Sequence, residues 1–224
     1  MMEIQAYGDS ALLINFEQKI DQHIHELVQA YFNTINQMEG VIYQIPAYCS
    51  ITVVFDKEIT DYYRLKSKIE EITIKQDKIK RDYRTIEIPV CYDLEFAPDL
   101  ESLAQDIKLS PDQIISLHTS KTYDVYMIGF LPGFPYLGKL PQELECKRKP
   151  VPRKQVKAGS VGIAGKQTGI YPTDAPGGWQ LIGQTPLKIF NALAEENFLL
   201  KMGDKVKFKS ISSDTFYKIL NDGK

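Results

Sequence analysis

Apolar side chains between Asp21 and Gly40 stand three or four positions apart, which places them on one stripe of an amphipathic helix that ends before Gly40. An apolar run at Ser10–Phe16 and alternating apolar residues within Val41–Phe55 predict flanking β-strands. A second helical stripe begins near Thr60. This order of strand, helix, strands and helix predicts a small α+β domain whose two helices cover one face of the sheet.

A charged run from Lys75 to Arg84 interrupts the apolar pattern. Because few side chains in this run could contribute to a core, we place a domain boundary there. The chain is thereby divided into a first domain at 1–84 and a second at 85–224.

The second domain has a different pattern of residues. Strand signal resumes at Thr85–Tyr92, and two short helical segments follow at Asp99–Lys108 and Pro111–Leu117. Ser110 can cap the second segment in a Ser-x-x-Gln box. From Tyr123 onward short β-rich runs alternate with glycine and proline, which predicts a barrel or sandwich with tight turns.

Charge and composition limit the classes of partner. The chain has 224 residues and a formal net charge of -2, so it lacks the basic surface that nucleic-acid binding requires. It shows neither a secretory signal nor a run of about 18 apolar residues, which predicts a cytoplasmic protein that does not enter membranes. An odd number of cysteines, far apart in sequence, argues against a disulfide framework and a thiolate zinc site.

Glycine and proline are concentrated in three segments, Tyr126–Leu137, Pro152–Pro172 and Ala175–Pro186. Such density restricts the backbone and predicts rigid loops at one rim of the barrel. Aromatic residues in these segments could wall a pocket for a small ring or a peptide: Phe130, Phe134, Tyr136, Tyr171 and Trp179. The alternative for any one of them is a place in the barrel core, except that Trp179 follows two glycines and is expected at the rim.

Histidine and arginine supply the candidate polar chemistry. His118 closes the second short helix, where the helix dipole favours the imidazolium form, so it either transfers protons or binds a ligand, or simply caps backbone carbonyls. His23 and His25 point in different directions on the first helix, so we predict no protein-built metal site. Arg153 suits a substrate carboxylate, with a solvated basic loop as the alternative, whereas Lys154 and Lys157 are expected to be solvated.

The segment Ser160–Gln167 looks superficially like a phosphate-binding loop. It lacks the first glycine and the serine or threonine after lysine, and more β signal follows it instead of a helix. We therefore expect any nucleotide site to be of another kind, or to be completed by a partner.

Three motifs, Gly129–Leu137, Ala158–Gly165 and Gln167–Pro172, resemble the family described as the 5-oxoprolinase B subunit, kinase inhibitor KipI or allophanate hydrolase subunit 1. The resemblance extends from Gly8–Ile14 to Gly203–Val206, nearly the whole chain. It implies an α+β fold, with an N-terminal ferredoxin-like α/β domain followed by a C-terminal cyclophilin-like β-barrel domain.

The resemblance also implies an activity and partners. The expected function is that of one subunit of an ATP-dependent 5-oxoprolinase, which hydrolyses the lactam of 5-oxo-L-proline to L-glutamate. The expected partners are a chain of related barrel fold that resembles the C subunit of 5-oxoprolinase and a chain that resembles its A subunit. The protein is expected to be inactive alone. The ATP site is expected to be shared with a partner subunit, with Mg²⁺ accompanying ATP.

The site residues implied by the resemblance fall into three groups. They are His118 and Arg153 as catalytic residues; Tyr126, Phe134, Gln167, Tyr171, Gly177, Gly178 and Trp179 as substrate-binding residues; and Gly159, Ser160, Gly162 and Gly165 as an anion-binding turn. Arg153 would hold the substrate carboxylate, Tyr171 and Trp179 the ring, and His118 a proton. Gln184 departs from the family pattern, since arginine is common at its position.

An alternative function remains open from the sequence. Members of the same family inhibit a sporulation-type sensor histidine kinase without catalysis, and a hydrophobic rim of Phe130, Phe134 and Trp179 would suit such a partner. Proline isomerase activity would rest on the barrel fold alone.

Overall fold

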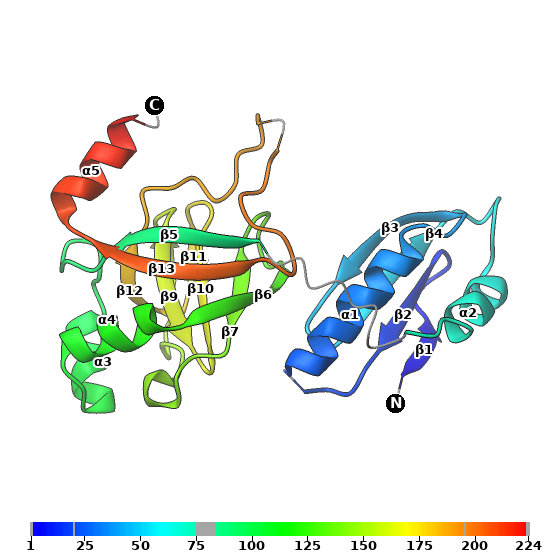
Figure 1. Cartoon of the computed structure of the whole chain (residues 1–224), viewed down its shortest axis with the longest axis horizontal. Coiled ribbons are helices and arrows are strands. Elements are labelled where there is room, and N and C mark those ends of the chain that lie inside the picture. Colours follow the sequence, from blue (N-terminus) through cyan, green and yellow to red (C-terminus); the bar gives the residue numbers. More distant parts are fainter. Residues whose placement is uncertain (1, 20, 75–83, 195, 223–224) are drawn as a thin grey trace. The chain divides into compact units, whose positions relative to one another are not determined.

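The two apolar patterns on either side of the charged run fold into two units, Met1–Asp82 and Tyr83–Lys224 (Figure 1). The computed structural model describes residues 2–19, 21–74, 84–194 and 196–222. Of the charged run in which the boundary between 1–84 and 85–224 is predicted, only Arg84 is among the described residues.

The described part of the N-terminal unit is a four-stranded antiparallel sheet with two helices. The sheet has the order β1-β2-β4-β3, and the elements are β1 (Glu3–Ala6), β2 (Ala11–Asn15), α1 (Gln22–Ile35), β3 (Val41–Pro46), β4 (Ser50–Phe55) and α2 (Tyr62–Glu70). From β2 onward the chain follows a ferredoxin-like β-α-β-β-α path, and β1 supplies the edge strand beside β2. The ferredoxin-like prediction is therefore confirmed.

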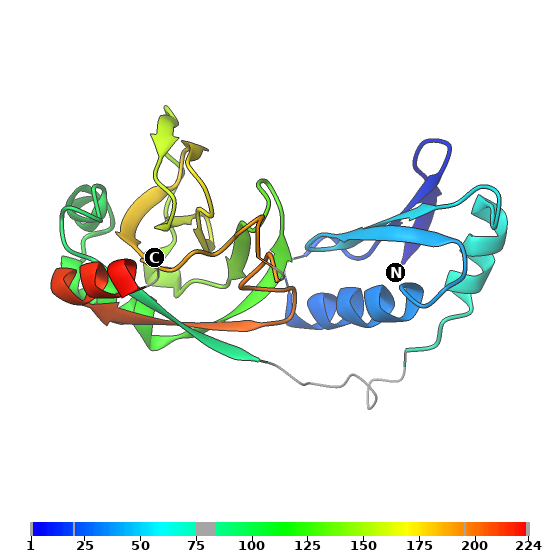
Figure 2. The ribbon, with the colours of Figure 1, turned by 90° about the horizontal axis from the view of Figure 1, so that it is seen from above.

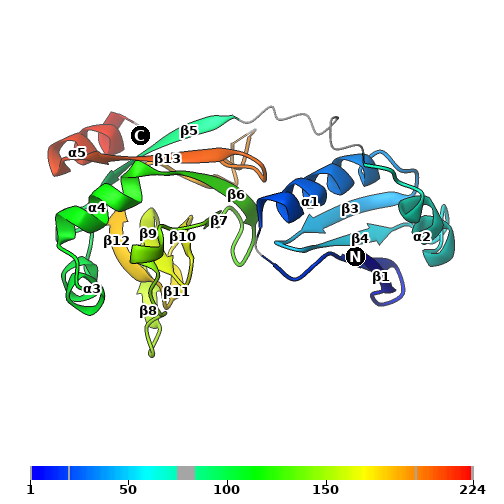
Figure 3. The same cartoon turned by 60° about the horizontal axis from the view of Figure 1, so that its bottom comes forward.

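The first helix forms where its apolar stripe predicts it. Asp21 caps α1, because its carboxylate accepts a hydrogen bond from the His23 backbone N–H at 2.9 Å. The stripe then buries Ile24, Val28 and Ile35, while α1 lies along β3 and β4 (Figure 3). Burial of this stripe fixes the helix on the sheet.

The described part of the C-terminal unit closes into a β-barrel in the order β10-β7-β6-β13-β5-β12-β9 (Figure 1). Its strands are β5 (Thr85–Cys91), β6 (Thr122–Ile128), β7 (Pro135–Gly138), β9 (Ser160–Ala164), β10 (Gln167–Ile170), β12 (Gln180–Gln184) and β13 (Lys205–Ile211). β13 pairs in parallel with β5, whereas its pairing with β6 is antiparallel. Apolar side chains fill the interior, so the predicted cyclophilin-like barrel is confirmed.

Helices and a short ribbon flank the barrel. They are α3 (Leu100–Ile107), α4 (Pro111–Ser120), the 3₁₀ turn η2 (Gln142–Leu144), the ribbon strands β8 (Arg153–Val156) and β11 (Ala175–Gly177), and α5 (Ser213–Asp222). Figure 2 shows α5 continuing from β13, and Figure 3 shows the ribbon beside β9 and β10. The predicted capping box begins α4, with the Gln113 N–H donating to Ser110 Oγ at 3.2 Å and the Ser110 N–H donating to Gln113 Oε1 at 2.7 Å.

Among the helices that the structure describes, none combines the length and the apolar composition needed to cross a membrane. The cytoplasmic location stays a prediction.

Candidate functional site

Aromatic side chains gather in a cluster that is separate from the barrel interior and borders the ribbon strand β8. Phe134 lies at its centre, and from its ring the centroid distances are 4.9 Å to Tyr136, 5.2 Å to Tyr171, 5.5 Å to Trp179 and 5.6 Å to Phe130. All four contacts are edge-on, the arrangement that aromatic quadrupoles favour. We call these five residues the aromatic cluster.

Exposure differs across the aromatic cluster. Phe134, Tyr171 and Trp179 are buried, Tyr136 is half-buried, and Phe130 is 62% exposed. The expectation that Trp179 lines an open rim is therefore wrong, because its ring packs against Phe134 and Tyr136. Of the hydrophobic rim expected for a kinase partner, only Phe130 is open to solvent.

Glycines allow the aromatic cluster to pack this closely. A side chain at Gly169 would place its Cβ 2.9 Å from the Phe134 ring, and one at Gly177 would meet the Tyr171 hydroxyl. At both positions glycine is needed because a neighbouring ring occupies the space of a side chain. The predicted binding residue Gly177 thus shapes the cluster by leaving room for Tyr171.

A basic stretch, residues 148–153, lies against the aromatic cluster, and we call it the basic segment. The Arg148 guanidinium lies over the Trp179 ring, 5.9 Å from its centroid, within the range of a cation–π contact. The Lys149 backbone N–H donates to the Gly178 carbonyl at 2.7 Å, which fixes the segment beside Trp179. The predicted residue Gly178 therefore contributes through its backbone.

A buried carboxylate, that of Asp99, binds both Lys149 and Arg153 of the basic segment. Its Oδ1 accepts hydrogen bonds from Lys149 Nζ at 2.7 Å and Arg153 Nη2 at 2.6 Å, and its Oδ2 accepts the Leu181 N–H at 2.7 Å. The Asp99 side chain is only 3% exposed, and a buried charge must be paired in this way. Burial alone would raise the pKa of Asp99, but hydrogen bonds from Arg153, Lys149 and the Leu181 N–H lower that pKa below its ordinary value.

Arg153 lies in the site, and one of its terminal nitrogens is already bonded to Asp99. Nη2 donates to Asp99, while Nη1 is buried and has no hydrogen-bond partner among the described residues. Because Nη2 is shared with Asp99 and Nη1 is buried, the Arg153 guanidinium presents little open donor surface to a second carboxylate. The carboxylate role predicted for Arg153 stays a prediction.

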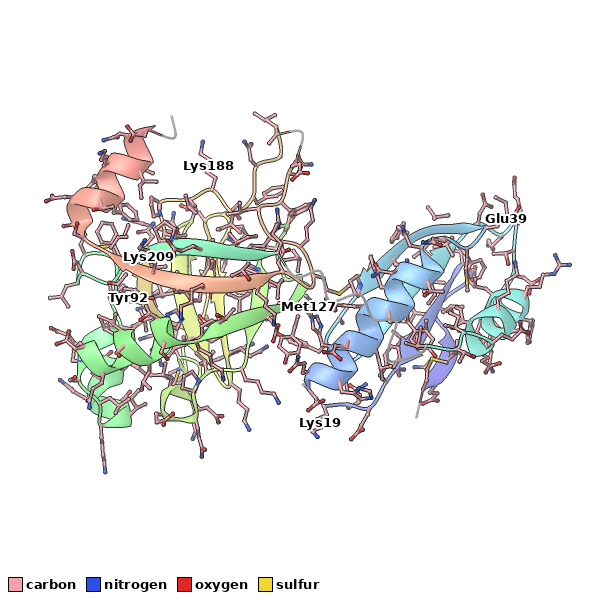
Figure 4. All side chains as sticks on the ribbon, in the orientation of Figure 1. Lys19, Glu39, Tyr92, Met127, Lys188 and Lys209 are labelled. Atoms are coloured by element: carbon pink, nitrogen blue, oxygen red, sulfur yellow. The ribbon has the colours of Figure 1, made fainter. Side chains whose placement is uncertain are left out.

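His118 lies in the barrel core, fully buried and stacked on Phe208 with a centroid distance of 4.4 Å. Thr168 Oγ1 donates to the Gly162 carbonyl, so it accepts from His118 Nε2 at 2.9 Å. His118 Nδ1 then accepts from the hydroxyl of Tyr92, the residue after β5 that is labelled in Figure 4, at 2.8 Å. These bonds define a neutral Nε2–H tautomer.

The expectation of an imidazolium at His118 is therefore wrong. Burial lowers the pKa of His118 to about 3, and this desolvation outweighs the helix dipole. Both ring nitrogens form hydrogen bonds with side chains, those of Tyr92 and Thr168, so neither caps a helix carbonyl as the alternative prediction had it. Because its side chain has no exposed surface, the geometry does not support direct proton exchange with a substrate.

The predicted anion-binding turn is also wrong as a structure. Ser160 and Gly162 lie in strand β9, with Gly159 at one end and Gly165 at the other. The N–H groups of Gly159, Ser160 and Gly165 each donate to a backbone carbonyl of the chain, at 2.7, 3.2 and 2.6 Å. This segment therefore offers no cradle for phosphate oxygens.

Two further predicted residues flank the strand β7. Tyr126 is buried and packs on Gly138, where a Cβ would come within 2.8 Å of the tyrosine ring. Gln167 lies in β10, is half-buried and pairs with Gly138 of β7. Tyr126 and Gln167 thus lie on β6 and β10, the two strands that pair with β7, and β7 carries Tyr136 of the aromatic cluster.

Sequence reasoning missed Asp99, Arg148 and Lys149. The basic run around Arg148 precedes Arg153 by only a few residues, and its density of positive charge was an available signal. Asp99 gave none, since its partners lie 50 or more positions further along the chain. Within the described residues, no group of three or more His, Cys, Asp or Glu side chains could hold a metal ion.

Comparison with known proteins covers both units of the chain. A family model described as the carboxyltransferase domain, subdomain C and D, matches residues 2–200. The B subunit of 5-oxoprolinase from Bacillus subtilis (strain 168) is 42% identical, over 96% of this chain and 95% of its own length. The B subunit of 5-oxoprolinase from Escherichia coli O157:H7 is 37% identical, over 90% of this chain and 92% of its own length.

A solved structure supports the same fold. The crystal structure of TTHA0988 superimposes with a TM-score of 0.81 at 31% identity. The match covers 91% of this chain and 40% of TTHA0988, so the chain spans less than half of that protein.

Proposed function

The chain belongs to the family of 5-oxoprolinase B subunits, and from this premise we propose that it is one subunit of an ATP-dependent 5-oxoprolinase, which hydrolyses 5-oxo-L-proline to L-glutamate. The observation that carries the proposal is the contact between the aromatic cluster and the basic segment. The aromatic cluster suits the flat ring of a small molecule, and the basic segment suits its anionic group.

5-Oxoproline consists of a five-membered lactam ring and one carboxylate. An apolar wall with a few placed polar groups is the usual composition of a small-molecule site. Half-buried Tyr136 and exposed Phe130 form the open side of the aromatic cluster, and Arg148 adds positive charge beside Trp179. The chain's own residues would bind and orient the ring and its carboxylate.

ATP and Mg²⁺ are part of the proposal, but no step on this chain is derived through them. ATP would supply the free energy for opening a lactam, whose carbonyl is a poor electrophile. Because the segment from Gly159 to Gly165 uses its N–H groups within the barrel, we assign the phosphates mainly to a partner chain. The proposed partners are a chain of related barrel fold that resembles the C subunit of 5-oxoprolinase and a chain that resembles its A subunit.

Reconstitution tests the proposal. The chain is mixed with its partner subunits, and ATP hydrolysis is measured with and without 5-oxoproline, together with glutamate formation. We expect ATP hydrolysis that depends on 5-oxoproline and on every subunit, and none from the chain alone. If the mixture is inactive while the chain blocks autophosphorylation of a sensor histidine kinase, the enzyme proposal is wrong and the KipI-like function replaces it.

A further inference from the structure

Arg148 differs from the other cations of the basic segment. Lys149 and Arg153 are both paired with Asp99, whereas Arg148 has no ion pair within the described ranges of the chain. Its side chain is exposed, yet its guanidinium packs over Trp179. The structure thus holds an unneutralised guanidinium against an aromatic wall.

The position of Arg148 is fixed by its neighbours. The next residue, Lys149, is held twice, by its N–H on the Gly178 carbonyl and by its Nζ on Asp99. Arg153 returns to the same carboxylate oxygen, and prolines at 150 and 152 stiffen the backbone between them. Asp99 therefore closes a short, rigid loop from Lys149 to Arg153, and Arg148 directly precedes this loop.

The charge of Arg148 is directed at the aromatic cluster. Burial raises the pKa of Tyr136 and Tyr171, and the nearby positive charge of Arg148 opposes this rise in both residues. Arg153 acts on Tyr171 in the same sense. An anion bound beside these hydroxyls would meet two guanidinium charges, of which only that of Arg148 is free of a carboxylate.

We propose that Arg148 binds the carboxylate of the cyclic-amide substrate at the edge of the aromatic cluster, and that Asp99 is the positioning residue that holds Arg148 there through Lys149 and Arg153. The inference rests on the proposed function and deepens it. Arg148 is better placed than Arg153 for this role because its side chain is exposed, whereas Arg153 is paired with Asp99 and its Nη1 is buried.

Kinetics of the reconstituted complex test the role of Arg148. Arg148→Gln should raise the KM for 5-oxoproline roughly 10- to 100-fold, the loss expected for a hydrogen bond to a charged group. The KM for ATP should change less than about twofold, and Arg148→Lys should recover part of the loss. Lys154→Gln, which removes an exposed charge from β8, is the matched control and should leave both constants unchanged.

Asp99 has its own readout. Asp99→Asn should also raise the KM for 5-oxoproline and spare that for ATP. Combined with Arg148→Gln it should add little, because both changes remove the same contact. Independent, multiplicative effects on this KM would show that Asp99 does not act through Arg148, and an unchanged KM in Asp99→Asn would show a role in stability alone; either result would overturn its positioning role.

Other outcomes separate the two proposals. If the wild-type complex is active and Arg148→Gln leaves the KM for 5-oxoproline unchanged, the inference is overturned and the proposed function stands. If Arg148→Gln raises the KM for ATP instead, Arg148 binds nucleotide phosphates, and the inference is again overturned. If the wild-type complex is inactive, the proposed function fails, and calorimetric titration of the full chain decides the inference. It should bind 5-oxoproline but not 2-pyrrolidinone, which lacks the carboxylate; equal binding, or none, overturns the inference.

Discussion

Replacing Asp99 by asparagine perturbs the one carboxylate that holds the basic segment. The amide keeps the shape and can still accept the Leu181 N–H, but it removes the charge that lies 2.7 Å from Lys149 Nζ and 2.6 Å from Arg153 Nη2. Breaking a buried ion pair by removing one partner costs about 3–5 kcal/mol. Because the side chains of Lys149 and Arg153 remain 28% and 26% exposed, water recovers part of this, and we expect a loss of roughly 2–3 kcal/mol.

Thermal unfolding measures this loss. In a domain of about 150 residues, 2–3 kcal/mol corresponds to a fall in Tm of roughly 6–12 °C. Trp179 is the single tryptophan of the chain, so its emission follows the C-terminal unit alone. Asp106→Asn, on the exposed side of α3, is the matched control and should change stability by less than about 0.5 kcal/mol. Equal Tm values for wild type and Asp99→Asn would refute the reasoning.

The pH dependence gives a second check on the same variant. The folded pKa of Asp99 lies below the ordinary carboxyl value of 3.8, so the carboxylate stabilises the fold fully above that pH. This contribution is lost as the pH falls from 3.8 through the lower folded pKa. The difference between wild type and Asp99→Asn should therefore shrink in acid, and a constant difference down to about pH 2 would contradict the assignment.

Two other predictions follow from the packing. Gly177→Ala should cost about 1–3 kcal/mol in chemical denaturation, because the new methyl group meets the Tyr171 hydroxyl, while Gly178→Ala, whose Cβ would find neighbours only at 3.7 Å and beyond, should cost clearly less. Similar losses in the two variants would argue against the tight contact. Burial lowers the pKa of His118 to about 3, so its imidazole NMR resonances should not shift between about pH 5 and 8. An unfolded histidine takes up a proton below about pH 6.5, so His118 should reduce the stability of the fold as the pH falls below that value. A titration of His118 near pH 6.5 would contradict its place in the barrel core.

Local signals in the sequence were sufficient for several elements of the fold. The spacing of apolar residues and the cap at Asp21 predict α1, and the box formed by Ser110 and Gln113 predicts the start of α4. These signals work because each depends on neighbours within about four residues. The strand β1 was not predicted, since Glu3–Ala6 is only four residues long, too short for its alternation of polar and apolar residues to indicate a strand.

The site was less accessible, because it depends on contacts between distant segments. The glycines at 159, 162 and 165 suggested a turn, whereas they belong to a barrel strand and its ends. The sequence places His118 at a helix end where the dipole favours a charged imidazole, but in the structure its ring is buried in the barrel and bonded to Tyr92 and Thr168. Local patterns carry no information on such closure, which is decided when the barrel forms.

The central claim is that the aromatic cluster and the basic segment together form the substrate site. Fluorine NMR of the chain labelled with 5-fluorotryptophan, assembled with unlabelled partner subunits, gives one resonance from Trp179, the single tryptophan. We predict that 5-oxoproline shifts this resonance in a saturable manner and that Arg148→Gln weakens the response. A resonance that does not move in a complex that hydrolyses ATP in response to 5-oxoproline would place the substrate elsewhere and contradict the account.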